Sequence, residues 1–348
     1  MRIAMVNPFF MKGKGIDRVM FELGKRLKKW FDIEVLCAKA DYYDQFVNTK
    51  IIPSRKIFGY EAIDMYFKIG RHLKNYDVIN PHHEILNLPC LFSKKPVITT
   101  YHGFQRVWGG NIVRRCIRSA VLESHALFYR YNTHIITISK YLANELVQRY
   151  HIPKEKITIV HNGVDFEKFK LGKDKGYMLF VGRHERYKGV HELLQVVKET
   201  NFPLVTVGTG REIENLKLEA HRLGVSDKIK FMGNVGEKTL SKLYSNCSFF
   251  ISASKWEGFG LIFLEAAASK KPSIAYNICS IPEIIIHNKT GFLANNLEEM
   301  IKYCKILINN QNLRKKIGRE AYHFVKKNFS WDYAAKRYKE IFENFQKI

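Results

Sequence analysis

Short runs of β-branched and aliphatic residues alternate with longer helical patterns along most of the chain. Several runs are apolar at successive positions, which is typical of strands buried on both faces of a parallel sheet. Between them, apolar residues recur at helical spacing. The alternation predicts a doubly wound α/β fold. The predicted strands are 3–7, 33–37, 77–80, 97–101, 134–138, 157–161, 178–181, 204–207, 228–232, 249–252 and 273–276, and the predicted helices between them include 16–29, 141–150, 190–199 and 213–223.

The strand–helix rhythm restarts once, after the polar segment 162–175. A length of 348 residues fits about two domains at roughly 150 residues each. We therefore expect two Rossmann-like domains, at 1–165 and 166–328. The chain is helical in pattern from Leu297 onward, and its last segment, 329–348, carries a final helix.

Composition supports packed cores and excludes several protein classes. The chain is 46% hydrophobic and 13% aromatic, which argues against disorder. Its 6 cysteines have neither C-x-x-C nor zinc-site spacing, so they are expected to be reduced thiols of a cytoplasmic protein. The N-terminal apolar run is too short for a signal peptide, and no apolar stretch approaches the roughly 18–20 residues of a membrane span.

A formal net charge of +24 favours a polyanionic partner: nucleic acid, an anionic membrane face or a phosphorylated substrate. Nucleic acid is disfavoured, because the basic residues are dispersed and no helix-turn-helix, zinc finger or aromatic RNA-binding motif occurs. Segment 111–132 combines a helical apolar stripe with Arg114, Arg115 and Arg118 largely off it. It fits a basic helix on an anionic membrane, and equally a core helix with a solvated basic face.

Loops that follow the predicted strands carry the candidate chemistry, because ligands of parallel sheets bind beyond the carboxyl ends of the strands. In loop 8–18, Gly13 and Gly15 allow close backbone approach to a ligand at a helix N-terminus, although an ordinary glycine-rich turn explains them too. His102 ends the strand at 97–101, where it either faces a ligand or is a satisfied structural histidine.

Two further loops carry charged residues, one loop two basic residues and the other two acidic residues. Arg183 and Lys188 flank a turn before a helix, which suits a diphosphate, although a solvated basic loop would look the same. Glu257 lies in a glycine-punctuated turn, and Glu265 lies about one turn into the following helix. Such carboxylates can hold vicinal hydroxyls while the amides between them face an anion. A glycosidase pair of carboxylates is an equal alternative from the residues alone.

Glu257-Gly258-Phe259-Gly260-Leu261 with Glu265 resembles the E-x7-E motif of retaining, nucleotide-sugar-dependent glycosyltransferases of family 4. Further pieces agree in order along essentially the whole chain: 15–18, 101–103, 162–165, 182–189 and 207–210. The resemblance implies the GT-B fold, in which two Rossmann-like domains with parallel sheets face each other. It also implies that the last helix crosses back to the N-terminal domain.

The resemblance assigns roles residue by residue. Arg183 and Lys188 neutralise the departing diphosphate, and His102 hydrogen-bonds the donor sugar. Glu257 binds sugar hydroxyls and Glu265 the ribose hydroxyls. The remaining donor-binding positions provide backbone groups for the phosphates, sugar and nucleobase: Gly15, Gly208, Gly233, Asn234, Val235, Gly258, Phe259, Gly260 and Leu261. Where the family often has two adjacent glycines, this chain has Lys14-Gly15, so a lysine stands in place of the first glycine of that loop.

The implied reaction moves a hexose from a UDP- or GDP-linked sugar to a hydroxyl of a glycan or lipid-linked acceptor, with retention, by a front-face mechanism. No motif supplies a nucleophile with a base, and no Asp-x-Asp occurs, so no obligatory metal or cofactor is expected. Peripheral binding to the inner face of a membrane through 111–132 is an added hypothesis. The alternatives are a GT-B phosphorylase or epimerase, and a basic nucleic-acid or membrane-binding protein on this scaffold without transfer activity.

Overall fold

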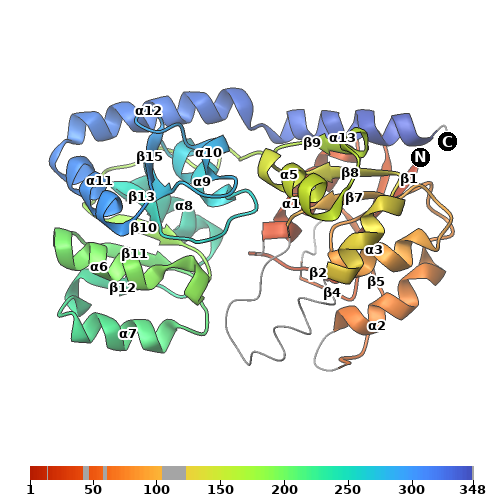
Figure 1. Cartoon of the computed structure of the whole chain (residues 1–348), viewed down its shortest axis with the longest axis horizontal. Helices are drawn as coiled ribbons and strands as arrows, with labels where there is room; N and C mark the ends of the chain where they lie inside the picture. The colour runs from red at the N-terminus through yellow and green to blue at the C-terminus, as the bar shows by residue number, and fades with distance from the viewer. Residues whose placement is uncertain (14, 42–46, 58–60, 104–122, 347–348) are drawn as a thin grey trace. The chain divides into compact units, whose positions relative to one another are not determined.

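The computed structural model describes residues 1–13, 15–41, 47–57, 61–103 and 123–346 (Figure 1). They form two compact units. The first contains the described residues up to 162 together with 331–346, and the second contains 163–330. Each unit is built on parallel strands with helices packed against them, so the predicted α/β class with parallel sheets is confirmed.

The second unit contains a six-stranded parallel sheet in the order β12-β11-β10-β13-β14-β15. Strands β11 and β12 follow β10 on one side of it, and the chain then crosses back so that β13 lies on the other side of β10. The strand order therefore reverses between β10 and β13, where open parallel sheets bind ligands. The strands are β10 (Met178–Val181), β11 (Leu204–Val207), β12 (Ile229–Phe231), β13 (Phe249–Ser252), β14 (Ser273–Tyr276) and β15 (Gly291–Ala294).

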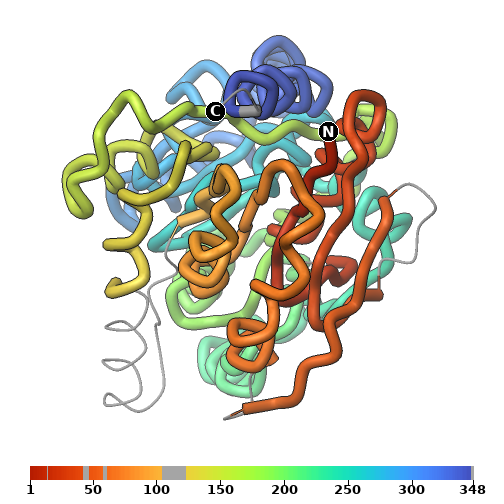
Figure 2. The backbone as a smooth tube through the Cα atoms, turned by 90° about the vertical axis from the view of Figure 1, so that its right-hand side faces the viewer, coloured from red at the N-terminus to blue at the C-terminus, as the bar shows by residue number. Residues whose placement is uncertain are grey.

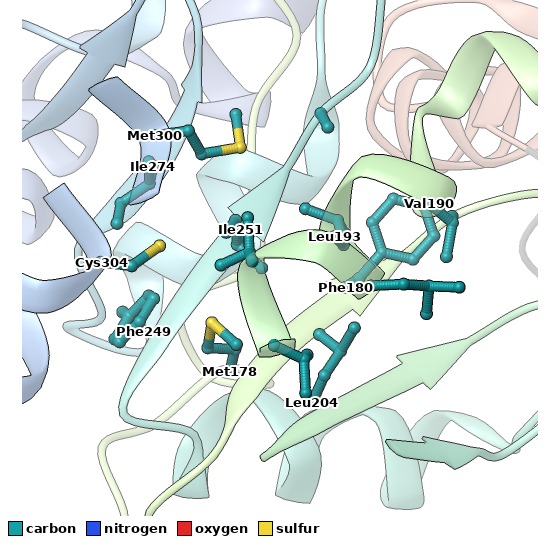
Figure 3. Close-up of a cluster of buried hydrophobic side chains, with 14 of the residues drawn as sticks. Met178, Phe180, Val190, Leu193, Leu204, Phe249, Ile251, Ile274, Met300 and Cys304 are labelled. Atoms are coloured by element: carbon teal, nitrogen blue, oxygen red, sulfur yellow. The ribbon is translucent and has the colours of Figure 1, made fainter. Parts of the chain in front are cut away.

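Apolar side chains from this sheet and from helices α6 and α11 form the core of the second unit (Figure 3). Phe180, Leu204 and Ile274 on the strands belong to one buried cluster with Leu193 on α6 and Met300 on α11 (Figure 3). The core fixes the strands from which the loops of interest emerge. The helices are α6 (Val190–Thr200), α7 (Ile213–Arg222), α8 (Glu237–Asn246), α9 (Leu261–Ala268), α10 (Ile281–Ile284), α11 (Leu297–Asn309) and α12 (Gln311–Asn328), with short 3-10 turns η4 (Arg186–Lys188) and η5 (Ser226–Lys228).

The first unit has a parallel sheet in the order β5-β3-β1-β6, which an Ile79–Val97 bridge extends into β7-β8-β9. Its strand order reverses between β1 and β6. The elements are β1 (Arg2–Val6), β2 (Phe9–Phe10), α1 (Gly15–Leu27), β3 (Asp32–Cys37), β4 (Lys39–Ala40), β5 (Asn48–Ile51), α2 (Glu61–Lys68), η1 (Ile69–His72), β6 (Val78–Pro81), α3 (Glu84–Leu91), β7 (Ile98–Tyr101), η2 (Leu127–Tyr131), β8 (His134–Thr137), α5 (Lys140–Tyr150), η3 (Lys154–Lys156) and β9 (Ile157–Ile159).

The last helix, α13 (Trp331–Gln346), belongs to the first unit (dark blue in Figures 1 and 2). It packs on α1, where Asp332 Oδ1 lies 2.8 Å from Arg26 Nε. The Phe342 ring packs edge-on against Phe31 at 6.1 Å between centroids, and the Tyr338 hydroxyl lies 3.1 Å from Thr100 Oγ1. The expected return of the C-terminal helix to the N-terminal part of the chain is confirmed.

Several elements differ from the sequence-based expectation. The predicted strand runs form strands within a residue or two at their ends, but β2, β4, β5 and β15 were not predicted. The proposed amphipathic helix at 111–132 lies outside the described residues up to 122, and its described end contains η2. Within the described ranges, no helix combines the length and apolar character needed to cross a bilayer.

Candidate functional site

Two loops of the second unit meet where the strand order reverses. One follows β10 and the other follows β13. The backbone N–H of Lys255 donates to the Tyr187 carbonyl at 2.8 Å. Gly189 has φ +66°, and a Cβ there would lie 2.1 Å from the Ala253 carbonyl oxygen. Only glycine permits this approach, which brings the charged residues of the two loops together.

Lys188 and Glu257 form an ion pair between these loops. Lys188 Nζ lies 2.5 Å from Glu257 Oε1, and their side chains are 12% and 10% exposed. An ammonium has three donors and a carboxylate has two acceptor oxygens, so neither group is saturated by one mutual hydrogen bond. The pair can therefore present donors to an anion and acceptors to hydroxyl groups at one place.

Tyr187 orients both predicted cations, and the sequence analysis missed it. Arg183 Nη2 donates to the Tyr187 hydroxyl at 2.6 Å. The Tyr187 ring centroid lies 5.8 Å from Arg183 Cζ and 5.1 Å from Lys188 Nζ. Because Tyr187 is buried, its ring is a fixed support for two flexible basic side chains. The available signal was an aromatic residue enclosed by basic neighbours in η4.

The turn after Glu257 leads into the N-terminus of α9. Gly260 adopts φ +101°, and α9 begins at Leu261. The buried Ser280 hydroxyl lies 2.9 Å from the Glu257 carbonyl oxygen and 3.0 Å from that of Phe259, so it fixes the turn. The predicted positions 258–261 thus present amides at the end of a helix, which favours anions. Glu265 is buried within α9.

The ends of β10, β11 and β12 lie side by side in the same sheet, and β10 is the neighbour of β13. The Gly208 N–H donates to the Gly233 carbonyl at 2.8 Å, and a Cβ on Gly208 would lie 2.1 Å from the Gly182 oxygen. Asn234 and Val235 follow Gly233 directly. The structure therefore gathers Arg183, Gly208 and the segment 233–235 along the carboxyl edge of one sheet.

The other predicted site residues, Gly15 and His102, belong to the first unit. Gly15 is the first residue of α1, and a Cβ there would meet nothing within 4 Å. The loop before it is anchored by the buried Asp17, which accepts from Asn7 Nδ2 at 2.7 Å and from the Met11 N–H at 2.8 Å. Lys14 lies outside the described residues. His102 follows β7, and its Nε2 lies 2.9 Å from His82 Nδ1.

Gly189→Ala is expected to separate the two loops and lower the free energy of unfolding by about 2–4 kcal/mol, because the new methyl group collides with backbone that cannot move aside. Urea denaturation of purified protein measures the change. Gly176→Ala is the matched control, since Gly176 has φ +71° but its Cβ would meet nothing within 4 Å. Equal losses in the two variants would show that the Gly189 contact carries no strain.

His184 makes the stability of the second unit sensitive to acid. Its ring is fully buried beside Phe180 and Phe231, with Nε2 3.0 Å from Thr206 Oγ1, and burial lowers its pKa to about 4. Below the unfolded pKa of 6.5 only the unfolded chain gains this proton, so stability is lost as the pH falls from about 6.5 to 4. The expected loss is about 3 kcal/mol.

Thermal or urea unfolding between pH 7 and pH 4.5 measures this loss, with His184→Gln as the comparison. The variant is expected to show a flatter pH dependence, whatever its stability at pH 7, because the titrating ring is gone. A pH slope identical to that of the parent protein would refute this assignment.

The comparisons with known proteins agree over almost the whole chain. Residues 13–168 match the family described as Glycosyltransferase Family 4, and residues 163–324 match Glycosyl transferases group 1. An uncharacterised glycosyltransferase of Methanocaldococcus jannaschii is 29% identical, over 99% of this chain and 98% of its own length. A capsular polysaccharide biosynthesis glycosyltransferase of Staphylococcus aureus is 27% identical over 65% of each protein.

Solved structures share the fold. HepE of Anabaena, crystallised with UDP and glucose, has a TM-score of 0.81 at 17% identity and covers 99% of both chains. Sucrose-phosphate synthase of Thermosynechococcus elongatus has a TM-score of 0.83 at 17% identity, covering 99% of this chain and 98% of that one. These identities establish the fold rather than the substrate. With both halves of the chain matched in sequence, the protein belongs to the family 4 type of glycosyltransferases with the GT-B fold.

Proposed function

We propose that this glycosyltransferase moves a hexose, with retention, from a nucleoside-diphosphate sugar to a hydroxyl acceptor. The observation that carries the proposal is the Lys188–Glu257 pair where the sheet order of the second unit reverses. A sugar diphosphate has an anion on one side of the reacting bond and hydroxyl groups on the other. In the Lys188–Glu257 pair, the ammonium can donate to the phosphate oxygens and the carboxylate can accept from the sugar hydroxyls, on either side of the bond that breaks.

In this proposal the diphosphate is held by Lys188, Arg183 and the amides of 258–261. Lys188 uses one donor on Glu257 and keeps two for phosphate oxygens. Arg183 and Lys188 are preset by Tyr187, so little reorganisation is needed as negative charge grows on the leaving group. Charge neutralisation by these side chains requires no obligatory metal or cofactor.

The hydroxyl groups and the base of the donor are assigned to neighbouring positions. Glu257 accepts from sugar hydroxyls and Glu265 from those of the ribose. The base pairs with backbone groups at 233–235, where the Gly208–Gly233 contact fixes the edge. We assign donor binding to the second unit and acceptor binding to the first. Gly15 and His102 of the first unit keep the roles that the resemblance implies for them in binding the donor.

The reaction follows a front-face course. The bond between the anomeric carbon and the diphosphate oxygen breaks, and the acceptor oxygen bonds to that carbon from the side that the leaving group vacates. The acceptor hydroxyl proton passes to the departing phosphate oxygen, so no protein nucleophile or base is needed. Retention results because attack and departure share one face of the ring.

Uridine diphosphate donors are the first to test, because HepE was crystallised with UDP, UDP-glucose and glucose. The proposed acceptor is a hydroxyl of a glycan or a lipid-linked sugar. A peripheral membrane association remains a proposal that rests on the net charge of +24 and on segment 111–132. Sedimentation with anionic liposomes at low and high salt tests it, and no binding at low salt would reject it.

A melting-temperature screen against UDP- and GDP-linked hexoses tests the donor proposal. A donor at 100 times its dissociation constant stabilises the folded protein by about 2.7 kcal/mol. We expect one base to shift the melting temperature of the parent protein, and Arg183→Ala to weaken that shift. NMR of the glycoside then gives the anomeric configuration. No shift with any donor would overturn the donor assignment, and an inverted product would overturn the front-face course.

A further inference from the structure

A chain of hydrogen bonds runs through the first unit and ends at His102. His82 Nδ1 lies 2.9 Å from His102 Nε2, and His82 Nε2 lies 2.8 Å from Asn80 Oδ1. His82 and Asn80 are buried, 2% and 0% exposed, at the end of β6, while His102 is half-buried after the neighbouring β7. The partners of these side chains determine which ring nitrogen carries each proton.

Asn80 sets the direction of the chain. Its Nδ2 donates to the Ile98 carbonyl at 2.5 Å and to Thr100 Oγ1 at 3.0 Å. A backbone carbonyl only accepts, so the amide nitrogen must face it and Oδ1 must face His82. Since Oδ1 also only accepts, His82 Nε2 carries the proton in that hydrogen bond.

His82 then sets the tautomer of His102. Burial, followed by the nearby His102, lowers the pKa of His82 well below 6.5, so the ring holds one proton, already placed on Nε2. His82 Nδ1 is therefore a bare acceptor, and His102 Nε2 must donate to it. Burial, followed by His83, also lowers the pKa of His102 to about 3, which leaves His102 neutral with a lone pair on Nδ1.

We propose that His82 is a positioning residue that holds His102 as the Nε2–H tautomer, so that His102 Nδ1 accepts a hydrogen bond from a hydroxyl of the sugar substrate. Among the described residues, none hydrogen-bonds to His102 Nδ1. A bare nitrogen attracts an O–H group and repels phosphate or carbonyl oxygens. His102 is thus assigned to recognising a hydroxyl rather than to holding the diphosphate. This inference rests on the proposed function.

The tautomers can be observed without substrate. Long-range ¹H–¹⁵N correlation spectra of ¹⁵N-histidine-labelled protein at pH 7 distinguish the two neutral forms and the charged form. We expect His82 and His102 each to be neutral and protonated at Nε2. In His82→Leu, His102 is expected to become a mixture of tautomers. A charged or Nδ1-protonated His102 in the parent protein would overturn the proposal.

Steady-state kinetics tests the consequence for turnover. His82→Leu removes the acceptor for His102, and kcat/KM is expected to fall by about tenfold or more. In His82→Asn, Oδ1 stands near the position of the ring Nδ1 and accepts in its place, so most activity is expected to return. His221→Leu, an exposed histidine on α7, is the control. Equal losses in His82→Leu and His82→Asn would contradict the positioning role.

Deoxy donors identify the hydroxyl and exclude a general structural effect. With the donor that lacks the recognised hydroxyl, the parent protein and His82→Leu are expected to turn over at nearly the same rate, because the missing contact is shared. If the parent protein and His82→Leu differed in turnover by the same factor with every deoxy donor as with the full donor, the proposal would be overturned. Nucleotide binding by the second unit is expected to be the same in all His82 variants. If the donor assignment were wrong, the parent protein itself would bind no nucleotide sugar, which distinguishes that failure from a failure of the His82 proposal.

Discussion

Lys188→Ala is expected to lower kcat/KM for glycosyl transfer by about 10²–10³-fold, the range for removing one preset group that stabilises transition-state charge. Lys188 Nζ lies 2.5 Å from Glu257 Oε1, and the Lys188 side chain is only 12% exposed. Water therefore cannot replace the ammonium in the same geometry. Nucleotide affinity should fall as well. Initial rates and calorimetric titration with the nucleoside diphosphate measure the two effects.

The removal of Lys188 also leaves Glu257 buried without its cation, which destabilises the loop. Lys188→Met combined with Glu257→Gln removes both charges and is expected to recover stability but not activity. Lys255→Ala is the matched control, because this lysine lies near the same turn but pairs with Glu192 and is 43% exposed. Near-normal transfer by the stable double variant would remove Lys188 and Glu257 from the mechanism.

Phe342→Ala is expected to lower the stability of the first unit by about 3–5 kcal/mol, as for other buried phenylalanines. Phe342 is fully buried and packs edge-on against Phe31 and Tyr338. Typical domains are stable by only about 5–15 kcal/mol, so this change removes a large part of the total. Hydrogen exchange read by mass spectrometry assigns the loss of protection to peptides of one unit or the other.

The protection of β10 to β15 is expected to change little in Phe342→Ala, because α13 belongs to the first unit. Lys336→Ala, an exposed position on the same helix, is the control for an alanine substitution in α13 that leaves the buried face intact, and alanine itself favours the helix. If β1 and β3 exchanged no faster in Phe342→Ala than in Lys336→Ala, the packing of α13 would not contribute to the first unit as described.

The sequence predicted the parts of the fold whose cause is local. Buried parallel strands are continuously apolar, so β10, β11, β13 and β14 were predicted with their observed bounds. The pattern missed β5, an edge strand that reads Asn-Thr-Lys-Ile and is largely exposed. Such a strand forms through backbone pairing with β3, which leaves little trace in side-chain hydrophobicity.

The candidate site shows the same division. Motif spacing placed Lys188 and Glu257 at strand ends, but their contact depends on β10 and β13 being neighbours, which spacing alone does not reveal. Ser280 and His82 were missed because each acts through a partner about 20 residues away in the sequence. Their residue types carry no signal until the topology brings those partners together. Tyr187 is different, because its partner Arg183 is only four residues away and the basic neighbours of Tyr187 in η4 were a local signal that was overlooked.

The return of α13 to the first unit affects the order in which the newly made chain matures. The first unit cannot bury α1 fully until the final helix has left the ribosome, whereas everything needed by 163–330 is synthesised earlier. At a synthesis rate of about 5–20 residues per second, roughly 10–40 s pass between the synthesis of residue 162 and that of α13, the last element of the first unit. The exposed face of α1 is therefore the surface that chaperones would meet during synthesis.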